Sequence, residues 1–385
     1  MTKLYVDVSM LMVGTSFTGI PRVVMEVSRR LYHNKNLELV FLEYDQRRDG
    51  FRVIDTQGFI RFCKTREGSR QKLRSSRLID FGAFEKNAVF FDMDTVWKTR
   101  VRRSWLYPRL KAQGVRIIPF IQDIIGVTHP GFCPFYDRIN FIDFIGAALI
   151  YSEKIIVTSH ATEHAIEELG TQLAVSLPQL VIAPLGGNFG KQTQSEASVT
   201  ETSDEVRKAV AAGKYLLMVG TLEPRKNHKL LLDAYDAGLN NLDMNLIIAG
   251  YKGWNMDDFF ERLEKHPDYG KRIFHISKAT DADIAYLYGH CYSLAFPSYI
   301  EGYGLPIMEA FVRGVPVFAA DTEINQEIGR EYAVYFRKDQ PTDLVEKVES
   351  LLKNPQMYEL WKNRITEFVP PTWEETADRI MDVLL

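Results

Sequence analysis

The sequence predicts an α/β protein made of two Rossmann-like domains, and three observations support this fold class. Apolar runs of strand length alternate with helical periods along the whole chain, as expected for mainly parallel sheets covered by helices. A chain of 385 residues is too long for one ordinary core and suits two domains. A polar stretch, residues 186–213, contains few large apolar side chains and is expected to connect them.

Each predicted element rests on one of these patterns. In the first domain, assigned to residues 1–190, apolar runs predict strands at 3–8, 37–43, 87–91, 115–121, 154–158 and 180–183. Helical periods there predict helices near 20–33, 99–113, 137–150 and 160–169. In the second domain, assigned to residues 191–370, the predicted strands are 215–219, 244–249, 272–275, 292–296 and 315–319. Its predicted helices lie near 227–237, 256–265, 281–289, 305–313, 340–353 and 355–366, and a last helix follows at 371–385.

Composition restricts the class of protein. Hydrophobic residues make up 46% and charged residues 25% of the chain, which excludes disordered and fibrous proteins. Cys63, Cys133 and Cys291 are far apart and odd in number, so neither a disulfide framework nor a zinc site is indicated, and a reducing cytoplasm is expected. The chain opens with a predicted strand rather than a signal peptide, and no apolar run approaches the roughly 20 residues of a membrane span. Membrane contact is therefore expected to be peripheral, on the inner face.

Two loops of the second domain combine positive charge with backbone groups suited to an anion. Gly220 follows a predicted strand and opens the sequence Gly-Thr-Leu-Glu-Pro-Arg-Lys-Asn, which places Arg225 and Lys226 beyond the carboxyl edge of a sheet. The loop 301–309 reads Glu-Gly-Tyr-Gly-Leu-Pro-Ile-Met-Glu. Its glycines permit close approach to a ligand, and Pro306 suits the first turn of a helix, whose N–H groups attract anions. Together the two loops predict a pyrophosphate site.

These loops together resemble the signature of family 4 of the retaining glycosyltransferases, which have the GT-B fold of two facing Rossmann-like domains with an interdomain cleft. The likeness continues in the segment 314–317, Gly-Val-Pro-Val. In the first domain, residues 18–22 look like the family's Gly-Ile-x-Arg loop, and Gln122-Asp123 stands where many members carry His-Asp. Ser159 and the segment 373–375 also fit. The resemblance further implies that the last helix, 371–385, crosses back to the first domain.

The resemblance implies a role for each residue of the two loops. Arg225 and Lys226 would stabilise the charge on a leaving pyrophosphate, and backbone amides over 302–305 would hold the distal phosphate, so that no metal is required. Glu301 would contact hydroxyls of the transferred sugar, and Glu309, expected in the first turn of its helix, the ribose hydroxyls. A charged surface loop and a glutamate that complements a helix dipole are the structural alternatives. The implied donor-binding set is Gly19, Gly220, Arg225, Lys226, Gly302, Tyr303, Gly304, Leu305 and Glu309.

The first domain supplies Gly19, Gln122 and Asp123 to the predicted site. Gly19 opens a predicted helix, so neighbouring amides would approach a phosphate, unless the helix end has no ligand. Gln122 replaces a histidine that commonly contacts the sugar, and an amide donates a hydrogen bond but does not titrate as histidine does. Asp123 is expected to hold the acceptor, to orient its loop or to cap a turn. The resemblance implies that the departing phosphate oxygen takes the acceptor's proton, so no nucleophile is assigned.

A competing motif would place a divalent metal in the protein. The strand-like run at 90–94 ends in Asp92-Met93-Asp94, the pattern with which GT-A glycosyltransferases bind a metal and a nucleotide, and Asp281-Ala282-Asp283 repeats the spacing. The second pair opens a predicted helix, where aspartate caps are common, and the first lies outside the domain with the pyrophosphate motif. Asp92 and Asp94 are therefore interpreted as acceptor-side or structural residues, and no metal ligand is assigned.

Positive charge gathers in the first domain. Residues 1–190 contain 25 Lys and Arg against 19 Asp and Glu, whereas the rest of the chain contains 22 against 31. The segment 47–77 has ten basic and three acidic residues, and 98–116 has seven basic residues and no acid. These two segments are expected to contact an anionic membrane surface or the pyrophosphate of a lipid-linked sugar. A solvated basic face is the alternative, and nucleic acid is not expected because no recognised binding module accompanies the charges.

The resemblance implies a metal-independent retaining hexosyltransferase. Such an enzyme would move a sugar from a nucleotide-diphosphate sugar to a lipid-linked or oligosaccharide acceptor in polysaccharide or O-antigen biosynthesis. GDP-mannose is the favoured donor, because the layout looks most like mannosyltransferases of O-antigen and capsule synthesis, and dTDP-rhamnose or a UDP-hexose are alternatives. Two other functions stay open: a nucleotide-sugar epimerase on the GT-B scaffold, and a non-catalytic nucleotide-sugar binder in a synthase complex.

Overall fold

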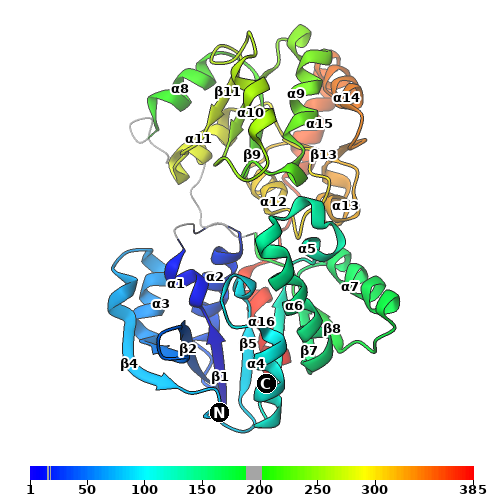
Figure 1. Ribbon diagram of the computed structural model, residues 1–385. Helices are drawn as coiled ribbons and strands as arrows, with labels where there is room; N and C mark the ends of the chain where they lie inside the picture. Colours follow the sequence, from blue (N-terminus) through cyan, green and yellow to red (C-terminus); the bar gives the residue numbers. More distant parts are fainter. Residues whose placement is uncertain (15–16, 18, 188–201) are drawn as a thin grey trace. The chain divides into compact units, whose positions relative to one another are not determined.

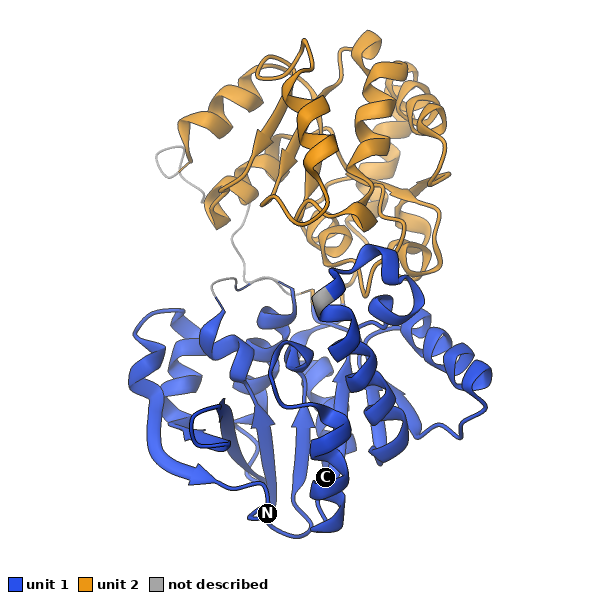
Figure 2. Ribbon diagram, viewed as in Figure 1, with its two compact units in different colours: residues 1–186, 371–385 blue, residues 187–370 orange. Residues whose placement is uncertain are grey.

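The structure of the protein, a computed structural model, describes residues 1–14, 17, 19–187 and 202–385 (Figure 1). The chain divides into two compact units (Figure 2). Unit 1 contains residues 1–186 and 371–385, and unit 2 contains residues 187–370. Half of the connection expected at 186–213, residues 188–201, lies outside the described part of the chain, as does Thr18 of the first-domain loop. Residues 204–211 of the expected connection form a helix.

Within its described residues, unit 1 is built around a sheet of eight strands in the order β4-β3-β2-β1-β5-β6-β7-β8. The strands are β1 (Thr2–Asp7), β2 (Leu37–Asp45), β3 (Gly50–Ile54), β4 (Arg74–Ile79), β5 (Val89–Asp92), β6 (Arg116–Ile121), β7 (Lys154–Val157) and β8 (Gln179–Ile182). The helices are α1 (Ser9–Val13), α2 (Ile20–Leu31), α3 (Thr56–Thr65), α4 (Arg103–Ala112), α5 (Ile125–Thr128), α6 (Phe135–Tyr151), α7 (His160–Leu173) and α16 (Trp373–Leu384).

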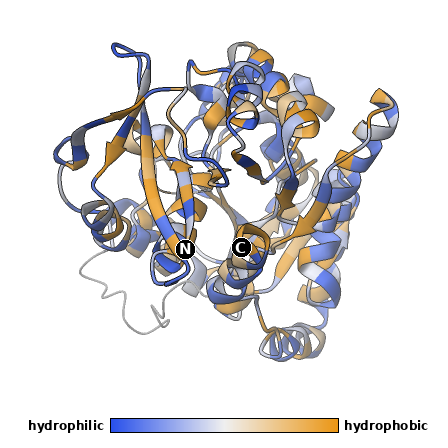
Figure 3. Ribbon diagram, turned by 90° about the horizontal axis from the view of Figure 1, so that it is seen from below, coloured by the Kyte–Doolittle hydropathy of each residue, from blue (hydrophilic) through white to orange (hydrophobic). Residues whose placement is uncertain are grey.

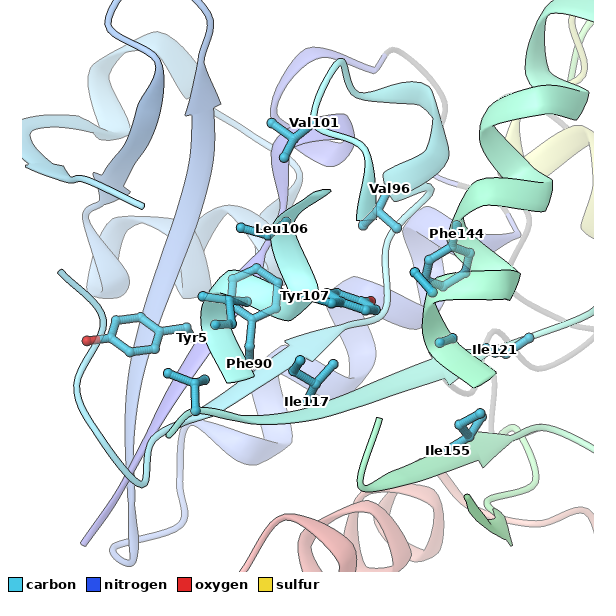
Figure 4. Packing of buried hydrophobic residues seen from close by; sticks show 14 of the residues in the cluster. Tyr5, Phe90, Val96, Val101, Leu106, Tyr107, Ile117, Ile121, Phe144 and Ile155 are labelled. Carbon is cyan, nitrogen blue, oxygen red and sulfur yellow. The ribbon is translucent and has the colours of Figure 1, made fainter. Parts of the chain in front are cut away.

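The centre of this sheet forms because its strands carry unbroken apolar runs. β1, β5 and β6 run parallel and are buried along most of their length, as expected for strands covered by helices on both faces. Side chains from these strands, from α4 and from α6 pack into one cluster, which includes Phe90, Tyr107, Ile117 and Phe144 (Figure 4). In Figure 3 the strands next to the N-terminus are coloured mainly as hydrophobic, whereas the helices carry both colours.

One edge of the unit 1 sheet was not predicted. Residues 50–79 form β3, α3 and β4, and the β2–β3 and β3–β4 pairs are antiparallel. Arg52 on β3 forms an ion pair with Asp45, and Arg74 on β4 donates to both carboxylate oxygens of Glu43 at 2.6 and 2.5 Å. These strands are therefore held partly by charged pairs across the sheet, which removes the apolar alternation that marks a strand in sequence.

Helix α16 ends the chain and packs against α2 of unit 1. Thr372 and Glu375 form a capping box at its start, and Trp373 is buried. Arg30 of α2 donates to Glu374 at 2.7 and 3.0 Å, which links the two helices. The last helix therefore belongs to unit 1, although the rest of unit 1 ends at Gly186.

Unit 2, within its described residues, has one parallel sheet of six strands in the order β11-β10-β9-β12-β13-β14. The strands are β9 (Tyr215–Val219), β10 (Asn245–Ala249), β11 (Ile273–Ile276), β12 (Ser293–Phe296), β13 (Val317–Ala320) and β14 (Val334–Phe336). The helices are α8 (Asp204–Ala211), α9 (His228–Ala237), α10 (Asp257–Glu264), α11 (Asp281–His290), α12 (Leu305–Val312), α13 (Glu323–Gly329), α14 (Pro341–Lys353) and α15 (Pro355–Ile365). Short elements α8, α13 and β14 were not predicted.

The predicted fold class is confirmed: both units are α/β with parallel sheet cores. Two helix boundaries were wrong. Residues 96–98 form a separate turn, so the helix predicted at 99–113 begins at Arg103, and the helix predicted at 160–169 continues to Leu173. In the described ranges of the chain, no helix is long and apolar enough to cross a membrane.

Candidate functional site

The two predicted anion-binding loops follow neighbouring strands of the unit 2 sheet. Chain order along this sheet reverses between β9 and β12, which pair in parallel. The loop after Val219 and the loop after Phe296 therefore leave the sheet at the same carboxyl edge. In open α/β sheets, ligands bind outside this edge at the point of reversal.

Arg225, Lys226 and Glu301 come together at this edge. Lys226 Nζ donates to Glu301 Oε1 at 2.7 Å, and Arg225 Nη1 donates to Glu301 Oε2 at 2.5 Å. Ser298 Oγ donates to Oε1 at 2.8 Å, and Arg225 Nε donates to Glu223 Oε2 at 2.9 Å. The structure thus joins side chains from two motifs that are 75 residues apart in the chain.

The electrostatics of the cluster keep Glu301 ionised. Its side chain is only 8% exposed, and burial by itself would raise the pKa of Glu301. Arg225 and Lys226 outweigh this effect and lower the pKa of Glu301 to about 2. Burial has the larger effect at Glu223 and raises the pKa of that carboxyl, although Arg225 and Lys226 oppose it.

Two features require a glycine at position 220: its backbone conformation and the nearby side chain of Lys226. Its φ of 139° is one that L side chains rarely adopt, and a Cβ there would lie 3.3 Å from Lys226 Cε and 3.5 Å from Nζ. The close approach of Lys226 to this turn gives a physical reason for a glycine at the first position of the motif.

The second loop leads into α12 as the sequence predicts. The backbone amides expected to hold the distal phosphate are those of Gly302, Tyr303, Gly304 and Leu305. Gly304 is the residue before the helix, with φ 97°, and Pro306 lies in the first turn. The prediction that Glu309 lies in the first turn was wrong, because α12 begins at Leu305 and its first turn holds no acid. Glu309 instead neighbours Tyr288: burial, and then the Glu309 carboxylate, raise the pKa of Tyr288 well above its ordinary value.

Unit 1 has a pocket at its own point of strand reversal, between β1 and β5. The pocket is lined by Ile20, Asp94, Trp97, Phe120, Ile121, Gln122, Asp123 and Phe144. It therefore contains two of the predicted site residues, Gln122 and Asp123, next to aromatic rings and a further carboxylate.

Local hydrogen bonds fix the polar side chains of this pocket. Gln122 Nε2 donates to the Met93 carbonyl at 3.1 Å, and Asp123 Oδ1 accepts from Ile125 N at 3.0 Å. Asp123 thus caps a turn and lines the pocket at once. Asp94 Oδ2 accepts from Leu11 N at 2.8 Å, and burial raises the pKa of Asp94 to about 6. The sequence singled out Asp94 only through the Asp92-Met93-Asp94 spacing, and interpreted it as an acceptor-side or structural residue.

Gly19 precedes α2, whose second residue is a proline. Its φ of 62° favours glycine, and a Cβ there would meet nothing within 4 Å. Ile20, the first residue of α2, lines the unit 1 pocket. The start of α2 therefore adjoins the pocket that contains Gln122 and Asp123.

The Asp-x-Asp segments have structural partners. Asp92 is buried and accepts from Arg103 Nε and from the Tyr107 hydroxyl, both at 2.7 Å. Arg103 Nη2 also donates to Asp7 at 2.5 Å, so one buried guanidinium bridges two strands. Asp283 forms a capping box with Thr280, as the helix start predicts. These bonds support the interpretation of Asp92 as structural.

Part of the basic segment 47–77 faces inward. Arg70 Nη1 donates to the carbonyls of Leu11 at 2.6 Å and Gly14 at 2.5 Å, and Arg74 is paired with Glu43. In the segment 98–116, Arg103 is buried. These three arginines stabilise unit 1 and do not belong to an open basic surface, which corrects the expectation that each segment acts as a whole.

Sequence reasoning missed three residues of the unit 2 site. Glu223 and Ser298 bond the charged cluster directly, and Gly250 permits a close approach, because a Cβ there would lie 1.9 Å from the Gly220 carbonyl oxygen. Glu223 lay within the quoted motif. Ser298 and Gly250 follow predicted strands, which was the available signal.

Comparison with known proteins finds similarity to glycosyltransferases. Residues 199–368 match the family model "Glycosyl transferases group 1". A serotype-specific mannosyltransferase of Escherichia coli, WbdA, is 28% identical over 397 residues, which cover 98% of this chain and 46% of that protein. The O-antigen chain mannosyltransferase B of Escherichia coli is 38% identical over 217 residues, 56% of this chain and 55% of that protein. The chain spans about half the length of these relatives.

Solved structures share the fold at low identity. HepE of Anabaena, solved in complex with UDP-glucose, has a TM-score of 0.67 at 13% identity, covering 100% of this chain and 99% of that chain. Sucrose-phosphate synthase of Thermosynechococcus elongatus has a TM-score of 0.64 at 16% identity, covering 100% and 98%. The family model thus matches most of unit 2, and the fold over the whole chain is that of GT-B glycosyltransferase structures.

Proposed function

We propose that this chain is a retaining hexosyltransferase that moves a sugar from a nucleotide-diphosphate sugar to a lipid-linked or oligosaccharide acceptor in polysaccharide synthesis. The observation that carries the proposal is the cluster of Arg225, Lys226 and Glu301 at the strand reversal of unit 2. Mannose is the favoured sugar and O-antigen the favoured product, since the relatives named above are mannosyltransferases.

The donor diphosphate would bind the cationic side of the cluster. An ammonium group has three N–H donors and a guanidinium has five, so the bonds to Glu301 leave both cations able to donate to phosphate oxygens as well. The start of α12 adds backbone N–H groups beside them. As the bond to the sugar breaks, negative charge grows on the departing phosphate, and cations held in place beforehand stabilise that charge most effectively.

Glu301 would hold both the cations and the sugar. Its two oxygens accept from Lys226, Ser298 and Arg225. An ionised carboxylate has about four acceptor sites, so capacity remains for one hydroxyl of the transferred sugar. Glu309 is proposed to accept from the ribose hydroxyls, and Gly302, Tyr303 and Gly304 to bring the backbone close to the phosphates.

The pocket of unit 1 would admit one hydroxyl group of a sugar, because it is about the size of a water molecule. Trp97 offers an apolar face, and Asp94, Gln122 and Asp123 offer acceptors and a donor for hydroxyls. Gly19 and the start of α2 would approach a phosphate from this unit. These residues are proposed for the acceptor side of the reaction.

The proposal is tested by incubating the protein with GDP-mannose, dTDP-rhamnose and UDP-hexoses, each with lipid-linked and oligosaccharide acceptors. Release of nucleoside diphosphate that depends on the acceptor is the expected result, with the α- or β-configuration of the donor kept in the product. Full activity in EDTA is expected, because the two cations supply the charge that a metal would otherwise supply. An isomerised donor without acceptor would instead identify an epimerase, and binding without turnover would identify a non-catalytic binder.

A further inference from the structure

One helix of unit 1 exposes a continuous apolar stripe. In α6, the exposed side chains among those described are all large and hydrophobic: Phe135 (66%), Ile139 (51%), Ile142 (49%) and Ile150 (62%). Their spacing of four, three and eight residues puts them on one face of the helix, with Gly146 between the last two. Single exposed hydrophobic residues are ordinary, whereas a continuous row marks a surface that contacts a partner or a membrane.

The opposite side of α6 packs into the core of unit 1. Trp97 contacts the rings of Phe141 and Phe144, with centroid distances of 4.7 and 5.8 Å, and α4 packs along the same helix. The stripe therefore does not arise from a helix that is loosely attached to its unit. It is the outer face of a fixed element.

The acids of α6 are turned toward the neighbouring basic segment. Asp137 pairs with Lys98 at 3.6 Å, and Asp143 accepts from Ser104 N at 3.2 Å. Next to α6, the segment 98–116 carries no acid. Its exposed cationic side chains are Lys98, Arg100, Arg102, Arg109 and Lys111. An apolar ridge thus runs beside a row of positive charges.

We propose that this face, the α6 stripe together with the exposed cations of 98–111, docks on the surface of an anionic lipid bilayer. The isoleucines and Phe135 would enter the boundary between headgroups and acyl chains, and the cations would contact lipid phosphates. The charge favours this occupant, because an apolar protein partner would need no row of cations. α6 has 17 residues, and no helix in the described part of the chain is long and apolar enough to cross a membrane. The helix would therefore lie along the surface of the bilayer.

Flotation with vesicles tests the proposal on the full chain. Phosphatidylcholine vesicles with phosphatidylglycerol should carry the protein upward, and vesicles of phosphatidylcholine alone should carry it less. Ile139→Ser with Ile142→Ser should weaken the apparent affinity at least about tenfold, because two exposed aliphatic groups no longer enter the bilayer. Arg102→Ser with Lys111→Ser should weaken it by a similar factor, and added salt should do the same to the unchanged protein.

The matched control removes two exposed hydrophobic residues elsewhere. Met357 and Leu360 of α15 are 51% and 62% exposed, and their replacement by Ser should leave flotation unchanged. All variants should keep the thermal stability of the parent chain, which excludes misfolding. The proposal is overturned if the unchanged protein does not float with phosphatidylglycerol, or if the isoleucine variant floats equally well. Lipid-free sedimentation that shows self-association only with the stripe intact, and no flotation, would identify an interface between copies instead.

Discussion

Glu301 is a buried carboxylate that fixes two cations at once. Because Arg225 and Lys226 both bond it, the two positive charges are placed before any diphosphate arrives. Charges held in this way need little reorganisation during a reaction. The two motifs predicted that these three side chains share one site, and their roles stay predictions. Ser298, which donates to Glu301, was not predicted, since one serine after a strand is too weak a signal by itself.

Replacing Lys226 with Ala should lower the rate of sugar transfer by at least about 100-fold, because the departing phosphate loses a preplaced cation. The measurement is acceptor-dependent release of nucleoside diphosphate under saturating donor. Lys229→Ala, which removes an exposed lysine one turn along the chain, is the control and should keep full activity. Near-normal rates in the Lys226 variant would refute the assignment of the donor site.

Glu301→Gln should destabilise the protein in a pH-dependent way. The pKa of Glu301 is about 2 in the folded chain against an ordinary 4.5, so the ionised carboxylate contributes stability above pH 4.5 that is lost as the pH falls through about 2. Chemical denaturation should therefore show a loss of roughly 3 kcal/mol at pH 7 that shrinks between these values.

The control for this experiment is Glu359→Gln, which changes an exposed carboxylate of α15 and should have little effect at any pH. A deficit in the Glu301 variant that stays constant from neutral to acid pH would mean that the carboxylate does not titrate as its cationic neighbours require.

At the scale of elements, long apolar strands were predictable and the sheet edge of unit 1 was not. Apart from Asn245, β9 and β10 consist of apolar residues, and nearly every side chain is buried, so their sequence alone identifies them. β4 reads Arg-Ser-Ser-Arg-Leu-Ile, and its pairing depends on bonds such as Ser75 Oγ to the Val53 carbonyl at 2.7 Å. Such bonds form only when the strands pair, so no local sequence pattern predicts the strand. The start of α12 was predicted correctly, but Glu309 is the fifth residue of the helix and therefore lies beyond the first turn assigned to it.

Trp373→Ala should lower the free energy of unfolding of unit 1 by about 3–5 kcal/mol, because a large aromatic side chain that is 1% exposed leaves a cavity. Denaturation followed by circular dichroism would report the change. Glu374→Ala on the same helix is the control: it removes the surface pair with Arg30 and should cost about 1 kcal/mol or less. Equal effects of both changes would argue against a core position for Trp373.

At the scale of the whole molecule, each unit has its own sheet and core, but unit 1 is made from two separate parts of the chain. Deleting residues 371–385 should therefore destabilise unit 1 and spare unit 2. Limited proteolysis should degrade the truncated protein to a resistant fragment within 202–370, while the full chain gives both units. If the truncated protein gave as much protease-resistant unit 1 fragment as the full chain, α16 would contribute little to the stability of unit 1.

The order of the chain has a consequence for biosynthesis. Gly186 lies against Trp373, so closely that a Cβ would fall 2.4 Å from the Trp373 nitrogen. This contact cannot form until the ribosome has released the residues of α16. Unit 2 has by then emerged in full, so the unit that is translated first is the one that is completed last, and the surface of α2 that α16 covers stays exposed until then.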